Sequence, residues 1–410
     1  MDIHKKEVTN YSLMHKDIKV ADIELDQFDG SISRIASIYN PRHLPPRAKK
    51  SVIDFRQWWR DRAIPKSRKE LKEFLESRGI ENTENYLMDN LGLSLNDCYW
   101  IRPNGIELRW EDANLFSNSF QNSMISKRSA IGSKDISSFS FSPDASTGGD
   151  LPKWWIMDNG VRYLVKGNEG GTSQQSRNEV LASIIHQSQE FSNHVDYDLV
   201  HISDGRIGCR SELFTSENAE FISAWELIGR HDYSKNEPFR DNFIKACIDG
   251  GIGKDEVIYH LDYMALTDFI MSNYDRHLNN FGVLRDPDSL RIIGMAPLFD
   301  TGNSMLYKNP LNISMRVSLE EKTHGLYSSY KSSIEHINNL RCVNIDTMPK
   351  RAKVESLYEG DILHESVPRK LGRLYEEKLK FVSELQRGCK FYDLQKRYDK
   401  SSSIDMFPTR

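Results

Sequence analysis

The stretch NYDRHLNNFGVLRDPDSLRIIGMAPLFD, residues 273–300, decides how this chain is interpreted. It begins with a cluster of polar side chains directly after a long apolar helical pattern, namely Asp275, His277, Asn279 and Asn280. Apolar pairs on either side of the sequence DPD then predict a short β-hairpin. Because this hairpin ends at Asp300, its open end should bring Asp300 back beside Asp275 and Asn280.

These residue types match the requirements of phosphoryl transfer. Such a site places one carboxylate near the attacking hydroxyl and offers a carboxylate and an amide oxygen to Mg²⁺ on the phosphates. Asp275, Asn280 and Asp300 have the required types in the required order. His277 could act as a base or as a neutral packing group, and the structural role is slightly favoured. Arg276 is expected either to contact a phosphate or to pair with an acid.

The composition is that of an ordinary soluble protein. Its 410 residues suffice for two or three domains, and the net charge of -4 gives no overall attraction to nucleic acid or anionic membranes. Five scattered cysteines favour free thiols over a zinc site or a disulfide framework. There is no signal-peptide pattern and no run of about 18 apolar residues, so we expect a cytoplasmic protein with no membrane span.

Residues 1–130 are predicted to form a largely helical N-terminal region of unknown role. Helical patterns cover residues 52–62, a segment with Ser67 and Glu70 as a capping box that stops at Gly79, and residues 86–91. Trp58 and Trp59 are expected in a core rather than on a nucleic-acid surface. The Ser- and Asn-rich segment 116–142 is predicted to be a linker that contains the domain boundary.

The next segment predicts a strand, a glycine loop and two further strands, the last ending at Lys166. Gly148 and Gly149 could lie over phosphates, although a plain turn is the commoner role of so short a motif. An amphipathic helix pattern over residues 173–189 carries Glu179. A lysine at a strand end, tied to a glutamate on the following helix, is how a protein kinase holds its ammonium group against the phosphates of ATP.

Two more strand patterns, 197–203 and 206–214, lead to Glu212 and Phe214. By their order alone, these residues occupy the place where the backbone of a kinase binds adenine. We therefore expect a kinase-like N-lobe with the phosphate loop over 131–215, a helical C-lobe with catalytic and metal-binding loops over 216–395, and a flexible tail over 396–410. The expected fold class is α+β, a bilobal protein-kinase-like fold preceded by the N-terminal region.

Over roughly residues 135–390 the chain resembles the HipA family of bacterial toxin kinases. DRHLNN at 275–280 and APLFD at 296–300 are similar to its D-x-H-x-x-N and A-P-L-x-D elements, and STGGDLPK at 146–153 is similar to its phosphate loop. The resemblance implies that Asp275 is the catalytic aspartate and that Asn280 and Asp300 bind Mg²⁺. It implies an ATP-binding set made of Lys166 with its partner Glu179 and the loop residues Ser146, Thr147, Gly148, Gly149 and Lys153.

The same resemblance implies autophosphorylation in the loop, which ejects the loop in that family. Ser146 and Thr147 are the candidate phosphosites. Residues 150–152 depart from the more polar sequence that is commoner there, and the helical N-terminal region departs from the family's small β-rich module.

The implied function is that of an ATP- and Mg²⁺-dependent serine/threonine protein kinase with an unidentified protein substrate. A small helix-turn-helix antitoxin is an implied partner, through which alone DNA would be contacted. Two alternatives stay open. The DRH sequence is also similar to the catalytic loop of phosphatidylinositol kinases, which would make the acceptor a lipid or a small molecule. The chain could instead be an inactive, kinase-like binding module that acts through an antitoxin partner.

Overall fold

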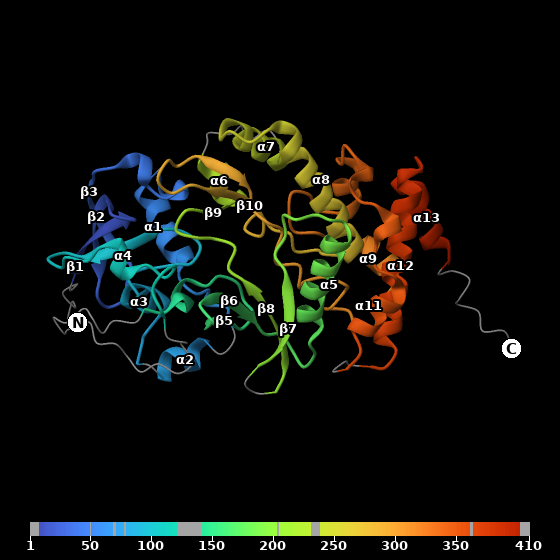
Figure 1. Cartoon of the computed structure of the whole chain (residues 1–410), viewed down its shortest axis with the longest axis horizontal. Helices are drawn as coiled ribbons and strands as arrows, with labels where there is room; N and C mark the ends of the chain where they lie inside the picture. Colours follow the sequence, from blue (N-terminus) through green and yellow to red (C-terminus); the bar gives the residue numbers. More distant parts are fainter. Residues whose placement is uncertain are drawn as a thin grey trace, which may run out of the picture.

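The computed structural model describes residues 8–49, 51–68, 71–77, 79–120, 141–202, 205–230, 238–360 and 364–401. Figure 1 shows a sheet-containing module at the N-terminal end, in blue, then a central group of green strands, and helices in orange and red toward the C-terminus. The predicted α+β class, with a β-rich part before a helical part, is confirmed. The domain boundary predicted near residue 130 and the capping residue Glu70 lie outside the described residues.

The N-terminal module, residues 8–120, contains a four-stranded antiparallel sheet of order β3-β2-β1-β4. Its strands are β1 (Val8–His15), β2 (Ile18–Asp26), β3 (Ile32–Ile38) and β4 (Tyr99–Pro103), and its helices are α1 (Val52–Arg62), α2 (Leu71–Ser77), α3 (Thr83–Asp89) and α4 (Trp110–Ala113), with the 3-10 helices η1 (Pro41–His43) and η2 (Pro46–Lys49). The α1 helix has the predicted bounds, and Trp58 and Trp59 are buried on it as expected.

The prediction of a largely helical N-terminal region was wrong, because it missed this sheet. The register shifts between Leu13 and Met14 in β1 and between Asp22 and Ile23 in β2. Such irregularities break the period-two alternation by which a half-buried strand is recognised in a sequence. In β1, for example, Leu13 and Met14 are consecutive and both buried.

A second antiparallel sheet, of order β5-β6-β8-β7, follows the module. It consists of β5 (Lys153–Asp158), β6 (Val161–Lys166), β7 (Tyr197–His201) and β8 (Ile207–Glu212), and α5 (Gln174–Ser188) runs beside β7 (Figure 1). Asn159 and Gly160, with φ of 51° and 82°, form the predicted tight turn. The strand predicted before the glycine loop falls on residues 138–142, of which 138–140 lie outside the described residues. Residues 141 and 142 are not in a strand, and the 3-10 helix η4 (Pro143–Ser146), capped by Ser142, follows them.

The hairpin predicted within residues 273–300 is present. Its strands β10 (Gly282–Arg285) and β11 (Ile292–Met295) join β9 (Glu220–Ser223) in a three-stranded antiparallel sheet of order β11-β10-β9.

The C-terminal part is helical. Its helices are α6 (Ala224–Arg230), α7 (Phe239–Asp249), α8 (Lys254–Met271), α9 (Met315–Glu320), α10 (Tyr330–Glu335), α11 (Arg351–Leu357), α12 (Val367–Gln386) and α13 (Phe391–Ser401), with the 3-10 helices η5 (Leu340–Cys342) and η6 (Ile345–Thr347). Helix α13 extends past residue 396, where a flexible tail was predicted, because Tyr398 packs on Phe381 of α12 with ring centroids 6.2 Å apart. The rest of the predicted tail, residues 402–410, lies outside the described residues. None of the helices within the described residues is long and apolar enough to cross a bilayer.

A buried charge network joins the N-terminal module to the three-stranded sheet. Glu220 Oε1 lies 2.8 Å from His15 Nε2 and accepts the Cys98 N–H at 2.8 Å. Glu220 Oε2 accepts from Arg285 Nη2 at 2.6 Å, and the same Arg285 nitrogen donates to the Tyr99 hydroxyl at 3.1 Å. None of these five residues is more than 1% exposed. The network therefore fixes the module against the sheet, and the two together border the cavity that contains the candidate site.

Candidate active site

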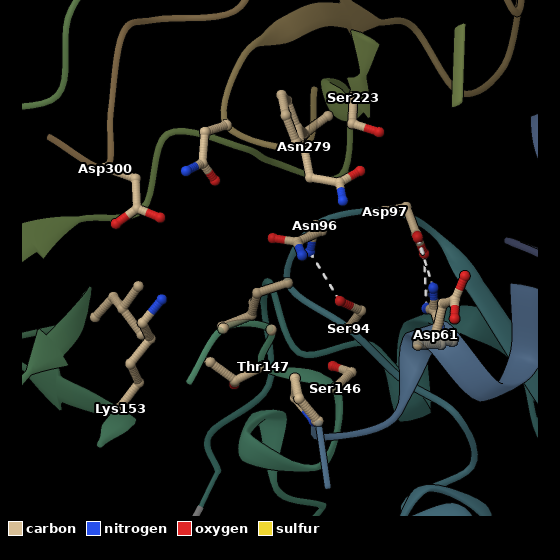
Figure 2. Close-up of a pocket in the computed structure, with 18 of the residues that line it drawn as sticks. Asp61, Ser94, Asn96, Asp97, Ser146, Thr147, Lys153, Ser223, Asn279 and Asp300 are labelled. Atoms are coloured by element: carbon tan, nitrogen blue, oxygen red, sulfur yellow. Dashed lines mark hydrogen bonds and ion pairs between the residues drawn. The ribbon is translucent and has the colours of Figure 1, made fainter. Parts of the chain in front are cut away.

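A cavity of about 860 Å³ opens between the N-terminal module, the second sheet and the 275–280 loop. Figure 2 shows Lys153 and Asp300 facing each other at one end and Ser94, Asn96 and Asp97 of the N-terminal module at the other. Of the predicted site residues, all except Asp275 and Glu179 line this cavity, and those two bond to residues that do.

Lys166, at the end of β6, lies at the centre of the charged groups. Its Nζ is 2.8 Å from Glu179 Oε1, 2.9 Å from Asp300 Oδ1 and 3.1 Å from the Tyr197 hydroxyl. The predicted Lys166–Glu179 ion pair is therefore present. Burial alone would lower the pKa of Lys166, but the carboxylates of Asp300 and Glu179 outweigh it and raise that pKa well above its ordinary value. Lys166 is thus a fixed positive charge.

Asp300 is held as a carboxylate in an unusual backbone conformation. Burial would raise its pKa, but the ammonium groups of Lys166 and Lys153 hold that pKa well below its usual range. Its φ of 60° lies in the left-handed region, which persists in a non-glycine residue only where the surroundings fix it. Here the next residue, Thr301, donates its N–H to Glu179 Oε2 at 2.8 Å. The two oxygens of Glu179 thus hold Lys166 and the segment that follows Asp300.

Other side chains of α5 bind the C-terminal part. Asn178 Nδ2 donates to the carbonyl oxygens of Gly302 and Ser304 at 2.7 and 2.8 Å. Asn178 Oδ1 accepts from the Tyr358 hydroxyl at 2.6 Å, and the neighbouring Arg177 donates to the carbonyl of Leu357. Helix α5 is therefore bonded both to the segment after Asp300 and to the end of α11.

Arg276 fixes the 275–280 loop from inside. Its Nε and Nη2 donate to the two carboxylate oxygens of Asp268 at 3.0 and 2.9 Å. Its Nη1 donates to the carbonyl oxygens of Asn280, at 3.1 Å, and Phe299. Of the two alternatives for Arg276, the structure therefore shows pairing with an acid. The bond to Phe299, the residue before Asp300, shows that the hairpin returns the chain to this loop.

Asn280 and Asp300 fit a magnesium site that is shared with phosphates. Asn280 Nδ2 donates to the backbone oxygen of Asp275 at 3.1 Å, which leaves the Asn280 Oδ1 as an oxygen ligand. Mg²⁺ prefers carboxylate and amide oxygens, and it is commonly held by one or two protein ligands together with substrate phosphates. No cluster of three or more His, Cys, Asp or Glu suited to a metal occurs in the part of the chain that the structure describes. The ligands present thus match a shared site.

Asn303 is a site residue that the sequence did not reveal. Its Nδ2 donates to Asp275 Oδ2 at 2.6 Å, and its Oδ1 accepts from Gln175 Nε2 of α5 at 2.9 Å. Through Asn303, the Asp275 carboxylate is thus connected to Gln175 of α5 and held in one orientation. Nothing in the local sequence signals the contact, because it joins residues far apart along the chain.

His277 lines the cavity, and its Nδ1 lies 3.3 Å from the N–H of Asn279, which donates to it. That bond uses one ring nitrogen within the loop, and the choice between a base and a packing group for His277 stays a prediction.

The glycine loop, residues 147–152, approaches the site closely. Gly149 has a φ of 84°, a conformation that favours glycine, and a Cβ there would lie 2.4 Å from Lys153 Nζ, so the Lys153 side chain would have to shift. The hydroxyls of Ser146 and Thr147 donate to the carbonyl of Pro143 at 3.3 and 3.1 Å. Both residues are buried. Both line the cavity, and each hydroxyl would have to give up its bond to Pro143 to accept a phosphate.

Glu212 and Phe214 lie beside an aromatic wall of the cavity. The rings of Phe214 and Phe299 are stacked with centroids 5.4 Å apart, and Phe221 packs edge-on against both. A flat apolar surface of this kind suits a planar ring such as adenine. The Leu213 N–H is already bonded to the Arg162 carbonyl at 2.9 Å, so any backbone contact to a ring would come from its neighbours.

Several cavity residues come from the N-terminal module, to which the sequence assigned no chemistry. They include Asp61, Ser94, Asn96 and Asp97. Arg62 pairs with both carboxylate oxygens of Asp97 at 2.6 and 2.7 Å, which holds this wall in place. Their place in the cavity depends on how the N-terminal module packs against the rest of the chain, and no local sequence pattern predicts that packing.

No family model and no curated protein matches the sequence. Among solved structures, the chain is similar to the proinflammatory kinase CtkA of Helicobacter pylori, at 17% identity and a TM-score of 0.44 over 61% of this chain and 95% of that chain. It is also similar to HipA of Shewanella oneidensis MR-1, solved with HipB and its operator DNA, at 12% identity and a TM-score of 0.49 over 92% of this chain and 99% of that chain. With identities and TM-scores this low, neither similarity by itself assigns an activity.

Proposed function

We propose that this chain is a protein kinase of HipA type, which transfers the γ-phosphoryl group of ATP to a serine or threonine hydroxyl of a cellular protein. The observation that supports this most is the position of Lys166 Nζ, bonded at once to Glu179 and to Asp300 in a cavity that Asn280 also lines. A fixed lysine, its glutamate partner and two metal-binding side chains are the parts that phosphoryl transfer requires.

In this proposal the nucleotide occupies the end of the cavity that contains Lys153 and Asp300. The phosphates bind to Lys166, Lys153 and the glycine loop, and adenine lies against the aromatic wall. Asn280 and Asp300 would hold Mg²⁺, which would supply charge neutralisation for the phosphates. Glu179 keeps Lys166 in place through one carboxylate oxygen and holds the Thr301 backbone through the other.

Asp275 acts on the acceptor. It orients the attacking hydroxyl and takes its proton as the new bond from oxygen to the γ-phosphorus forms. The bond from that phosphorus to the bridging oxygen of ATP breaks, and ADP leaves. Asn303 holds the Asp275 carboxylate in one orientation, and positioning of this kind supplies much of the rate enhancement of such enzymes.

Three further features of the proposal come from the resemblance. Ser146 or Thr147 is the autophosphorylation site, and phosphorylation would break the bond of that hydroxyl to the Pro143 carbonyl. A small helix-turn-helix antitoxin is the partner, and DNA is contacted through it, in line with the HipB and operator DNA in the Shewanella structure. The proposed location is the cytoplasm.

The test combines thermal unfolding with mass spectrometry. We expect ATP with Mg²⁺ to raise the unfolding temperature, and incubation to add phosphate to Ser146 or Thr147. A non-hydrolysable ATP analogue should stabilise the protein without adding phosphate. If the unfolding temperature did not change and no phosphate were added, the kinase assignment would be rejected and a binding module would be favoured. Label transferred only to phosphatidylinositol vesicles would instead identify a lipid kinase.

Replacing Asn303 by alanine should lower kcat more than it changes the KM for ATP. The substitution frees the Asp275 carboxylate to rotate, and loss of alignment at a reacting group costs up to about 10²-fold in rate. Single-turnover rates of autophosphorylation at increasing ATP concentrations, or steady-state kinetics on an identified protein substrate, would measure the split. Asn309→Ala, on an exposed side chain six positions along the same segment, serves as the control. An Asn303→Ala enzyme with the kcat of the unmodified chain would contradict the positioning role.

A further inference from the structure

Arg68 of the N-terminal module lies underneath the glycine loop. It follows α1, precedes α2, and is 9% exposed. About 80 residues separate it from the loop it contacts. Among the described residues, Thr147, Gly148 and Gly149 line the cavity, whereas Arg68 does not.

One guanidinium group binds three consecutive carbonyl oxygens of the loop. Nε and Nη2 donate to the Gly149 oxygen at 3.0 and 2.9 Å, and Nη2 also donates to the oxygens of Gly148, at 3.0 Å, and Thr147. The neighbouring Ser67 hydroxyl donates to Asp150 Oδ1. The planar guanidinium group of arginine carries several donors in fixed directions and can bond to all three oxygens. The single ammonium group of a lysine could not match this arrangement.

The contact stays charged. Burial lowers the pKa of Arg68 to about 10, against the opposing effect of Asp144 and Asp150, and a guanidinium with that pKa keeps its proton at neutral pH. The charged guanidinium group of Arg68 therefore holds the glycine loop throughout the physiological pH range.

The bonds from Arg68 to these carbonyl oxygens also fix the direction of the neighbouring backbone N–H groups. In a trans peptide the C=O and the N–H point in opposite directions. Carbonyls of residues 147–149 that face Arg68 therefore turn the N–H groups of residues 148–150 away from it, toward the side on which Gly148, Gly149 and Lys153 line the cavity. None of these three amides donates to a protein acceptor among the residues that the structure describes. Successive free amides beside an ammonium group form an anion-binding surface.

We propose that Arg68 is a positioning residue, by which the N-terminal module presets the glycine loop to bind the phosphates of the nucleotide. The identity of the anion rests on the proposed function, whereas the control of the loop by Arg68 does not. The N-terminal module thereby acquires a role in nucleotide binding without touching the nucleotide.

Hydrogen exchange in the nucleotide-free protein tests the control of the loop. Arg68→Gln should speed amide exchange at Thr147, the loop amide that is bonded to the Asp144 carbonyl at 3.1 Å, by about tenfold or more and leave peptides from α12 unchanged. Lys72→Gln removes an equal charge from the exposed face of α2 and should have no such effect. Unchanged exchange in the loop of Arg68→Gln would overturn the proposal. If Arg68→Gln does not fold, Arg68→Lys takes its place, with a smaller increase expected.

Nucleotide titration tests the consequence. With a fluorescent ATP analogue and Mg²⁺, Arg68→Gln should raise Kd by about tenfold or more and Arg68→Lys by less, because one ammonium replaces only part of the guanidinium group. The KM for ATP should rise with Kd, while kcat at saturating ATP changes far less. An unchanged Kd, or a loss confined to kcat, would overturn the positioning role. If the unmodified chain binds no nucleotide, the proposed function fails, and the exchange result still decides whether Arg68 controls the loop.

Discussion

Asp275→Asn protein is expected to transfer phosphate about 10²–10⁴-fold more slowly than the unmodified chain, with little change in nucleotide affinity. The substituted amide cannot accept the hydroxyl proton. The loop should keep its shape, because Asn280 bonds to the backbone of residue 275 and Arg276 stays paired with Asp268. An oxygen acceptor for Asn303 is also retained.

The measurement is single-turnover phosphorylation at saturating ATP, together with the thermal midpoint of each protein. Asp288→Asn provides the matched control, because Asp288 lies in the same stretch but is exposed at the hairpin turn. Asp300→Asn should also lose activity, with a raised Mg²⁺ requirement that Asp275→Asn does not share. Rates for Asp275→Asn close to those of the unmodified chain would remove Asp275 from its proposed role.

Glu220→Gln is expected to destabilise the folded chain by about 3–5 kcal/mol, because it removes one partner of a fully buried ion pair. The Arg285 guanidinium, 1% exposed, would lose its charge partner, and His15 would face an amide in place of a carboxylate. Urea unfolding followed by far-ultraviolet circular dichroism measures the change. The control is Glu111→Gln, because Glu111 forms an exposed ion pair with Arg109. This substitution should leave the free energy of unfolding almost unchanged.

The pH dependence of this difference has a definite sign. Burial would raise the pKa of Glu220, but Arg285 and His15 outweigh it and lower that pKa to about 2. A carboxyl with a depressed pKa in the folded state contributes its full stability above the unfolded pKa, near 4.5. That contribution is lost as the pH falls from there toward 2. The stability gap between the two proteins should therefore be constant above about pH 5 and narrow below it. If the difference in unfolding free energy between the two proteins widened as the pH fell, the lowered pKa of Glu220 would be contradicted.

The sequence was most informative where structure and chemistry are local. The hairpin that ends at Asp300, the strand that ends at Lys166 and the helix that carries Glu179 each follow from a periodic pattern, and their order suggested that they share one site. The Lys166–Glu179 and Lys166–Asp300 contacts agree with that order.

The sequence failed where position depends on contacts between distant segments. Asn303 and Arg68 bind site residues that are about 30 and 80 positions away, and neither has a local signature. The sheet of the N-terminal module was missed because register shifts in its strands disguise their alternation. For Asn303 and Arg68 the deciding information lies in how distant segments dock, which periodicity does not encode.

Helix α5 has a consequence for how this protein can be controlled. Many two-lobed enzymes are switched off by swinging the glutamate-bearing helix away from the lysine. Here Glu179 holds both Lys166 and the Thr301 backbone, and Asn178 is bonded to Gly302, Ser304 and Tyr358. An outward swing would break all of these buried bonds at once, each of which is costly to leave unmade. A partner or inhibitor of this chain should therefore act by blocking the cleft or by extracting the glycine loop, and compounds selected to trap a displaced helix should find no such state to bind.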